Sequence, residues 1–343
     1  MSGGVAAGLA IRFILGFIPV CLFLGSLVYL DSYKLVRLRT LLQLVAIGCI
    51  AAALSYVANQ TLLDSGVVER WLLTRVTAPL LEEILKAIPI LFLLRTRRVG
   101  FLVDAAIFGF AVGTGFALAE NVYYLWALSG SSPTLWVVRG FGTAVMHGGT
   151  TAIFAMITKT FFERKESEAM LLAFPGLVAA FAIHSFFNQF LFSPTVSAVA
   201  VIVLLPPLLA TVFGQSERYL RSWLGSEFDV DAELLEALRS GEFLSSRPGR
   251  YLQSVRERFD GVVMADMLCY LRLQTELSLQ AKGMLIMRES GLPVKKDSEI
   301  EDKIAELQFL RESIGKTGAL ALSPILPAAS HARWQLHMLA GGE

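Results

Sequence analysis

Charged residues are scarce in this sequence. Of its 343 residues only 17% are charged, 30 Lys and Arg against 29 Asp and Glu, whereas 55% are hydrophobic. The mean hydropathy is +0.59. So little charge places the chain among proteins that cross a membrane several times. The net charge of +1 offers no basic face, so we expect no nucleic-acid partner.

Cysteine is scarcer still, and two catalytic patterns are missing. Cys21, Cys49 and Cys269 are far apart, which excludes a disulfide framework and a cysteine zinc site. The sequence has no HExxH motif, so it is not a zincin, and no serine stands out for a Ser/His/Asp arrangement. We also expect no short cleavable signal peptide, because residues 9–30 are long enough to remain as a membrane span.

Long apolar runs are abundant. We predict an all-α fold, a polytopic transmembrane helical bundle of about seven spans with a small soluble helical module at its C-terminal end. The predicted spans are residues 8–30, 41–59, 75–94, 101–127, 134–159, 169–192 and 195–214. The predicted domains are a transmembrane bundle at 1–215, with a net charge of +4, and a helical module at 216–343, with a net charge of −3.

The C-terminal module has no catalytic pattern, but it has helix signals. We expect helices near residues 229–238, 254–288 and 328–339. Another is expected to begin at Ser298, with Glu301 at the spacing of a capping box.

Basic loops orient the predicted spans. Loops after the first, third and fifth spans carry the positive charge, and the other loops are poor in it; Arg12 alone runs against this pattern. The basic residues are Lys34, Arg37, Arg39, Arg95, Arg97, Arg98, Lys159, Arg164 and Lys165. The positive-inside rule then puts the N-terminus outside and the C-terminal module in the cytoplasm. For a bacterial chain the membrane is the plasma membrane.

Three ionisable residues interrupt the third predicted span. Glu82, Glu83 and Lys86 lie in an otherwise apolar stretch, where each costs at least ~2.5 kcal/mol before any pairing. Lys86 is four residues from Glu82 and three from Glu83, so it can neutralise either one. A self-paired cluster explains Lys86 and one glutamate, but it leaves the second glutamate for a function.

The fourth span carries one more carboxylate. Glu120 has no basic residue within its own span, so its partner must be another helix, a metal or a proton. Asn121 follows it, and Phe116 is on the same face. Gly109 and Gly113 form a GxxxG pair, which we interpret as a packing site for another helix.

The fifth and sixth spans each contribute a histidine. His147 follows Arg139, which either snorkels to the outer interface or faces inward. His184 and Asn188 are four residues apart and share a face. Buried histidines are usually satisfied core residues, but here both occur with carboxylates inside a membrane.

These polar residues have similar predicted depths. At ~1.5 Å per residue, Glu82, Glu120 and His184 lie about 10–12 Å below the outer surface, and His147 lies near ~20 Å. Two histidines with carboxylates suit Zn²⁺ with one position open for water, and a glutamate beside the metal can take the proton of that water. We therefore expect one site in the outer half of the membrane.

Four motifs occur in order on consecutive spans. They are Glu82-Glu83-x-x-Lys86, Phe116-x-x-x-Glu120-Asn121, His147, and His184-x-x-x-Asn188. Together they resemble the motifs of the PrsW intramembrane proteases, relatives of the CAAX-processing and Abi membrane endopeptidases, over roughly residues 70–192. The CAAX branch usually has arginine in place of Lys86 and histidine in place of Glu120, so the resemblance is to the PrsW branch.

The resemblance implies a membrane-embedded metallo-endopeptidase. His147 and His184 would hold the metal, with Glu120 as a further candidate ligand. The metal would be Zn²⁺ or another divalent ion, and a mechanism with glutamates alone stays open.

The same resemblance implies catalytic roles. Glu82 would activate water, alone or together with Glu83. Asn188 would stabilise the oxyanion, and the charge of Lys86 would keep the glutamates ionised.

The implied substrate is a membrane-anchored protein, such as an anti-sigma factor, cut near the extracytoplasmic face. Besides this substrate and the lipid bilayer, a cytoplasmic regulatory partner of residues 216–343 is a further candidate. Two other functions stay open: a proton-coupled transporter, and a non-catalytic signalling or scaffold protein. Transport predicts inverted repeats, and the sequence shows none.

Overall fold

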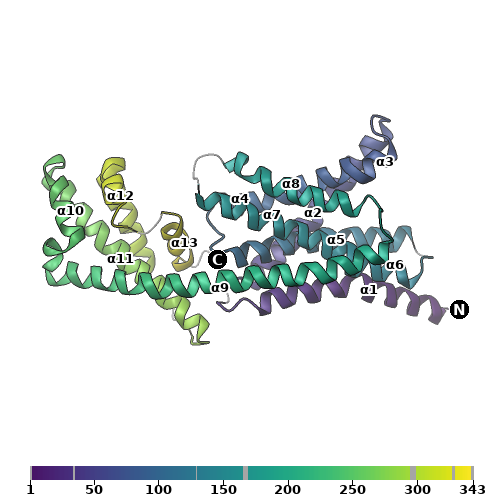
Figure 1. Ribbon diagram of the computed structural model, residues 1–343, viewed down its shortest axis with the longest axis horizontal. Helices are drawn as coiled ribbons and strands as arrows, with labels where there is room; N and C mark the ends of the chain where they lie inside the picture. The colour runs from purple at the N-terminus through teal and green to yellow at the C-terminus, as the bar shows by residue number, and fades with distance from the viewer. Residues whose placement is uncertain are drawn as a thin grey trace. The chain divides into compact units, whose positions relative to one another are not determined.

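The computed structural model describes residues 2–33, 35–128, 130–164, 169–293, 299–326 and 329–340. Within these ranges every regular element is helical and none is a strand, so the predicted all-α class is confirmed. The chain divides into two compact units, Met1–Ser216 (unit 1) and Glu217–Glu343 (unit 2) (Figure 1). Four residues used in the sequence interpretation lie outside the described ranges: Lys34, Lys165, Ser298 and Ala328.

Each of the seven stretches that were predicted as spans contains a helix. Unit 1 contains α1 (Ser2–Tyr29), α2 (Leu38–Asp64), α3 (Arg70–Leu72), α4 (Ala78–Arg95), α5 (Leu102–Ala127), α6 (Pro133–Val137), α7 (Val145–Arg164), α8 (Ala169–Phe187) and the first part of α9 (Pro194–Ser240). The π-helical segments η1 (Leu73–Thr77) and η2 (Val138–Ala144) lead directly into α4 and α7. Among the described residues, four helices are long and apolar enough to cross a membrane: α1, α2, α5 and α9. The full count of seven spans stays a prediction.

Among the four candidate membrane-spanning helices α5 is the most buried, and it packs against both α2 and α7. A Cβ at Gly113 would lie 2.2 Å from the backbone oxygen of His147, and one at Gly109 would lie 2.5 Å from that of Thr151. Both distances are far below van der Waals contact, so only glycine permits this approach. The GxxxG pair is therefore a packing feature, as predicted, and it fixes the backbone of α7 at His147.

The last predicted span is longer than expected. The sequence suggested an end at residue 214 and a separate helix at 229–238, but α9 is one continuous helix. Its acidic residues do not open a new helix. Instead, Asp231 Oδ2 accepts a hydrogen bond from the buried Lys282 Nζ at 2.8 Å.

Two other helix ends differ from the prediction. The sixth span was expected to reach residue 192, but α8 ends at Phe187, and Phe190 has a positive φ of 55° that a helix does not accommodate. The helix expected from residue 254 begins only at Gly261, because Asp260 has an extended backbone and acts as the N-cap.

Unit 2 is built around α11 (Gly261–Glu289). After the second part of α9 come η3 (Glu242–Ser245), α10 (Arg247–Val255) and η4 (Arg256–Arg258), and α11 is followed by α12 (Ile300–Leu322) and α13 (Ala329–Leu339). Both α12 and α13 pack against α11, which carries the fully buried Lys282. The functional division at residue 215, into a protease-like bundle and a cytoplasmic module, stays a prediction.

Candidate active site

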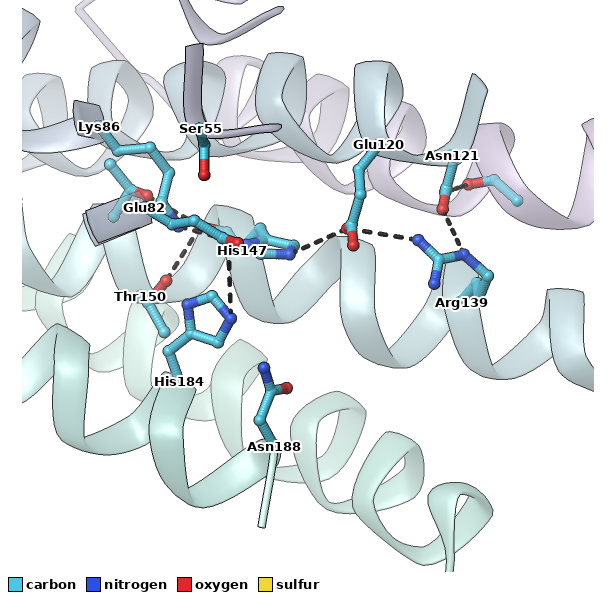
Figure 2. A network of polar contacts seen from close by, with 12 residues as sticks. Ser55, Glu82, Lys86, Glu120, Asn121, Arg139, His147, Thr150, His184 and Asn188 are labelled. Atoms are coloured by element: carbon cyan, nitrogen blue, oxygen red, sulfur yellow. Dashed lines mark hydrogen bonds and ion pairs between the residues drawn. The ribbon is translucent and has the colours of Figure 1, made fainter. Parts of the chain in front are cut away.

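The structure brings the ionisable residues of four helices into one cluster (Figure 2). They are Glu82, Glu83 and Lys86 of α4, Glu120 of α5, His147 of α7 and His184 of α8. The side chains of Glu83, Lys86, His147 and His184 are almost completely buried. Buried ionisable groups are tolerated only when they are paired, so their contacts define what each can do.

Glu83 is the carboxylate that Lys86 neutralises. Its Oε1 lies 2.6 Å from Lys86 Nζ and accepts a hydrogen bond from Thr150 Oγ1 at 3.2 Å. The same oxygen lies 2.7 Å from His184 Nδ1. With three donors converging on it, Glu83 is a structural centre of the cluster.

Glu82 is the more open of the two carboxylates. Because His184 donates from Nδ1 to Glu83, its Nε2 carries a lone pair, and this atom lies 3.7 Å from Glu82 Oε2. Two acceptors that face each other call for a proton or a metal ion between them. The Glu82 side chain is also 17% exposed, against 1% for Glu83, so Glu82 is the one that water can reach.

His147 is held from both sides. Its Nδ1 lies 3.2 Å from Lys86 Nζ, and its Nε2 lies 3.2 Å from Glu120 Oε2. An ammonium group only donates, so Nδ1 accepts and Nε2 carries the proton. The ring centroid is 4.8 Å from that of His184. Its side chain therefore contacts both Glu120 and His184, and the predicted depth of His147 in the membrane stays a prediction.

The donor set fits zinc. Glu82, His147 and His184 each offer one ligand atom, and these atoms lie within 4.8 Å of one another. Two imidazole nitrogens and one carboxylate oxygen are the protein ligands of some catalytic zinc sites, in which water takes the fourth position. Each histidine also has a carboxylate on its other nitrogen, Glu83 for His184 and Glu120 for His147, as metal-bound histidines usually do.

One contact stands in the way of a metal at this group. The ammonium of Lys86 is bonded to His147 Nδ1, the nitrogen that Glu120 leaves free. Metal binding through His147 therefore requires Lys86 to give up this contact while it keeps Glu83.

Glu120 faces an arginine as well as the histidine. Its Oε2 lies 3.3 Å from a terminal nitrogen of Arg139. Arg139 is only 8% exposed, so it does not snorkel to an interface but points inward. Glu120 lies outside the group of three candidate ligands, and its predicted role as a ligand stays untested.

Asn188 lies at the edge of the cluster, just after the end of α8 (Figure 2). Its Nδ2 donates to the backbone oxygen of Thr74 at 3.2 Å. The predicted face shared with His184 places it nearby, but its amide is held by η1 rather than by the carboxylates.

Sequence reasoning missed two hydroxyl groups at the site. Thr150 is three residues after His147, a helical spacing that could have flagged it. Ser55 of α2 is buried and points toward the same cluster (Figure 2), and it accepts a hydrogen bond from Asn59 at 3.1 Å. The spacing of Ser55 and Asn59, four residues apart in an apolar span, was the available signal.

An apolar groove adjoins the cluster. It has a volume of about 470 Å³ and is lined by α7, α8 and the first part of α9. Thr150 lines the groove and also bonds to Glu83, so this residue separates the groove from the polar cluster. Its other walls are formed by side chains such as Ile183, Phe186, Ala200 and Leu204.

Comparison with protein families gives one match. A family model described as PrsW family intramembrane metalloprotease matches residues 36–212, which is more than half of the chain. Neither a comparison with curated proteins nor one with solved structures found a similar protein. All residues of the polar cluster lie within the matched range, whereas α1 and the whole of unit 2 lie outside it.

Proposed function

This chain belongs to the PrsW family of intramembrane metalloproteases and is a membrane protease, and we propose that it cuts a membrane-anchored protein within the bilayer, near the extracytoplasmic face. The observation that carries the proposal is the group formed by Glu82, His147 and His184 in an apolar helical bundle. Three helices supply these donors. Lys86 already pairs with Glu83, so the fold does not need the second, more open carboxylate of Glu82.

We assign the proton transfer to Glu82. Its carboxylate is partly exposed and lies beside His184, so it can accept the proton of an attacking water and pass it to the leaving amine. A divalent metal such as zinc, which His147 and His184 would hold beside Glu82, would supply the activated water and polarise the scissile carbonyl.

The remaining residues of the cluster hold this arrangement in place. Glu83 fixes the tautomer of His184, Glu120 fixes that of His147, and Lys86 balances the charge of Glu83. Asn188 keeps the role of oxyanion donor in the proposal. Its Nδ2 would have to turn from Thr74 to the substrate.

The apolar groove is the proposed seat of the substrate. A protein that is cut inside a membrane presents an apolar segment, and the groove between α7, α8 and α9 is apolar and shares Thr150 with the polar cluster. Its volume of about 470 Å³ is within the usual range for binding pockets. We infer that it receives side chains from one face of the membrane span of the substrate.

The orientation of the site follows from the basic loops. Arg95 ends α4, and Arg97 and Arg98 follow it. Lys34 and Arg37 lie between α1 and α2, and Lys159, Arg164 and Lys165 lie in the last turns of α7 and directly after it. This favours an N-terminus outside, a C-terminal unit in the cytoplasm of a plasma-membrane protein, and a site in the outer half of the bilayer. An anti-sigma factor is one substrate with this topology, and a cytoplasmic regulatory partner of unit 2 stays a prediction.

The function is tested by comparing membrane proteins from cells that express wild type or Glu82→Gln at equal levels. New N-termini, mapped by mass spectrometry, should appear on the extracytoplasmic side of single-span proteins with wild type only. We expect cleavage to fall about 10²–10⁴-fold, the usual loss when a general base is removed.

The matched control is Glu227→Gln, which removes a carboxylate that lies 3.5 Å from the buried Lys282 in unit 2. This variant should cleave normally. Unchanged termini in Glu82→Gln would refute the role of Glu82, and termini on the cytoplasmic side would refute the orientation.

A further inference from the structure

A line of polar contacts runs from α1 to the candidate site (Figure 2). Asn121 Nδ2 donates to the backbone oxygen of Gly16 at 2.7 Å, and Arg139 Nε donates to Asn121 Oδ1 at 2.8 Å. A terminal nitrogen of Arg139 lies 3.3 Å from Glu120 Oε2, which in turn lies 3.2 Å from His147 Nε2. Three helices and η2 thus meet in one chain of contacts.

The central member of this line is held on several sides. Arg139 is buried, and its guanidinium carbon lies 3.8 Å from the centre of the Tyr124 ring. Asn121 is 1% exposed. A guanidinium that is stacked on a ring, hydrogen-bonded to Asn121 and ion-paired with Glu120 loses its freedom before any ligand arrives, which makes it a rigid support for a carboxylate.

α1 is packed tightly at the same place. A Cβ at Gly140, the residue after Arg139, would lie 1.8 Å from the backbone oxygen of Leu15. A Cβ on Gly16 itself would lie 2.8 Å from the Trp136 ring. The backbone of α1 therefore touches η2 beside the carbonyl that Asn121 uses.

We propose that Arg139 is a positioning residue for the metal ligand His147, and that α1 anchors it through Asn121. This inference rests on the proposed metal site, and it assigns a part of that site to a helix outside the family match at 36–212. Glu120 fixes the ring of His147 through Nε2, and Arg139 fixes Glu120. Loss of such an outer partner usually weakens metal binding by 10–100-fold.

The first test measures zinc affinity of the purified full-length protein by competition with a chelator. Arg139→Gln should weaken zinc binding by about 10–100-fold, and so should Glu120→Gln. The double variant should be no weaker than Glu120→Gln alone, because Arg139 acts through Glu120. Unchanged affinity in Arg139→Gln, or additive losses in the double variant, would overturn the role of Arg139.

The second test addresses α1. Gly140→Ala should push α1 away from η2 and weaken zinc binding. The matched control is Gly25→Ala in α1, where a Cβ would meet nothing within 4 Å. Equal zinc affinity in the two variants, with equal thermal stability, would exclude α1 from the site.

A third readout does not need a bound metal. Nitrogen NMR of the His147 ring should show the Nε2–H tautomer in wild type and a mixture in Arg139→Gln, and Arg139→Lys should restore part of it. If wild type binds no zinc, the proposed metal fails while the NMR result still decides the inference. An unchanged His147 signal in Arg139→Gln would then reject it.

Discussion

Among the residues that the structure describes, units 1 and 2 each bury one lysine completely, and the two sites are alike at first sight. Lys86 in unit 1 lies 2.6 Å from Glu83, and Lys282 in unit 2 lies 2.8 Å from Asp231. Each ammonium also lies over an aromatic ring, at 5.0 Å from the centre of Phe116 and 5.2 Å from that of Trp223.

The difference lies in what surrounds the pair. Lys282 has a second carboxylate at 3.5 Å, Glu227, and also donates to the backbone oxygen of that residue, so its surroundings serve the charge of the lysine. Lys86 instead shares its environment with two histidines and with Glu82, which it does not contact in the structure. A buried lysine is thus no sign of a site by itself. A functional site is indicated by ionisable groups beyond those that pair with the lysine.

The largest expected effect comes from removing each lysine in turn. Lys86→Met and Lys282→Met both leave a buried carboxylate without its partner, which costs about 3–5 kcal/mol. Only Lys86→Met should also abolish cleavage. Without Lys86 the charge of Glu83 is no longer balanced, and Glu83 then no longer holds His184 in place. Thermal unfolding and a cleavage assay on the full chain measure the two effects.

Equal loss of cleavage in both variants would break the comparison, because unit 2 would then take part in the reaction. Lys86→Arg serves as a second variant in case Lys86→Met does not fold. It keeps the charge of the buried pair, and cleavage at a reduced rate is expected from it.

A smaller effect is expected from filling a hollow in each unit. Ala200 lines the apolar groove of unit 1, and Ala319 lines a surface hollow on α12 of unit 2. Ala200→Trp should lower kcat/KM by about 10–100-fold, because the larger side chain would fill the space that the substrate needs in the groove. Forcing extra atoms into a packed space typically costs about 1–3 kcal/mol. Ala319→Trp should leave it unchanged. Full activity in Ala200→Trp would show that the substrate enters elsewhere.

The smallest effect separates two buried threonines. Thr150 Oγ1 lies 3.2 Å from Glu83 Oε1 and also 3.2 Å from the backbone oxygen of His147, whereas Thr275 of α11 donates to the backbone of its own helix at 2.8 Å. Thr150→Val removes one hydrogen bond to a carboxylate, worth about 1–2 kcal/mol, and should slow cleavage by about fivefold to thirtyfold. Thr275→Val should not change the rate. A rate loss in Thr275→Val alone would reverse the assignment of the two units.

The sequence predicted the site by its residues but not by its pairings. Spacing on α4 allowed Lys86 to pair with either glutamate, and only the arrangement of neighbouring helices selects Glu83. Thr150 and His184 lie 67 and 101 residues from Glu83 in the sequence, so no spacing along one helix could predict that both contact this carboxylate. Helix existence follows from local patterns, whereas the register between helices does not.

Arg139 shows why an ambiguous residue stays ambiguous without a fold. A long cationic side chain near a membrane surface usually reaches for water, and the sequence allowed that reading. The structure turns it inward because Asn121 and Glu120 lie side by side on α5 and offer two acceptors. The end of α9 was missed for a related reason, since the partner of Asp231 is on another helix.

The π-helical segment η2 has a consequence for the length of the chain. Its hydrogen bonds enclose one more residue per turn than those of an α-helix, and Arg139 is presented from within it. Deleting one residue here, such as the half-exposed Phe141, would let the segment relax into an α-helix and rotate Arg139 by about 100° relative to α7. Relatives of this chain should therefore tolerate exchanges at Phe141 but never its loss, so the count of residues is under stronger selection here than their identity.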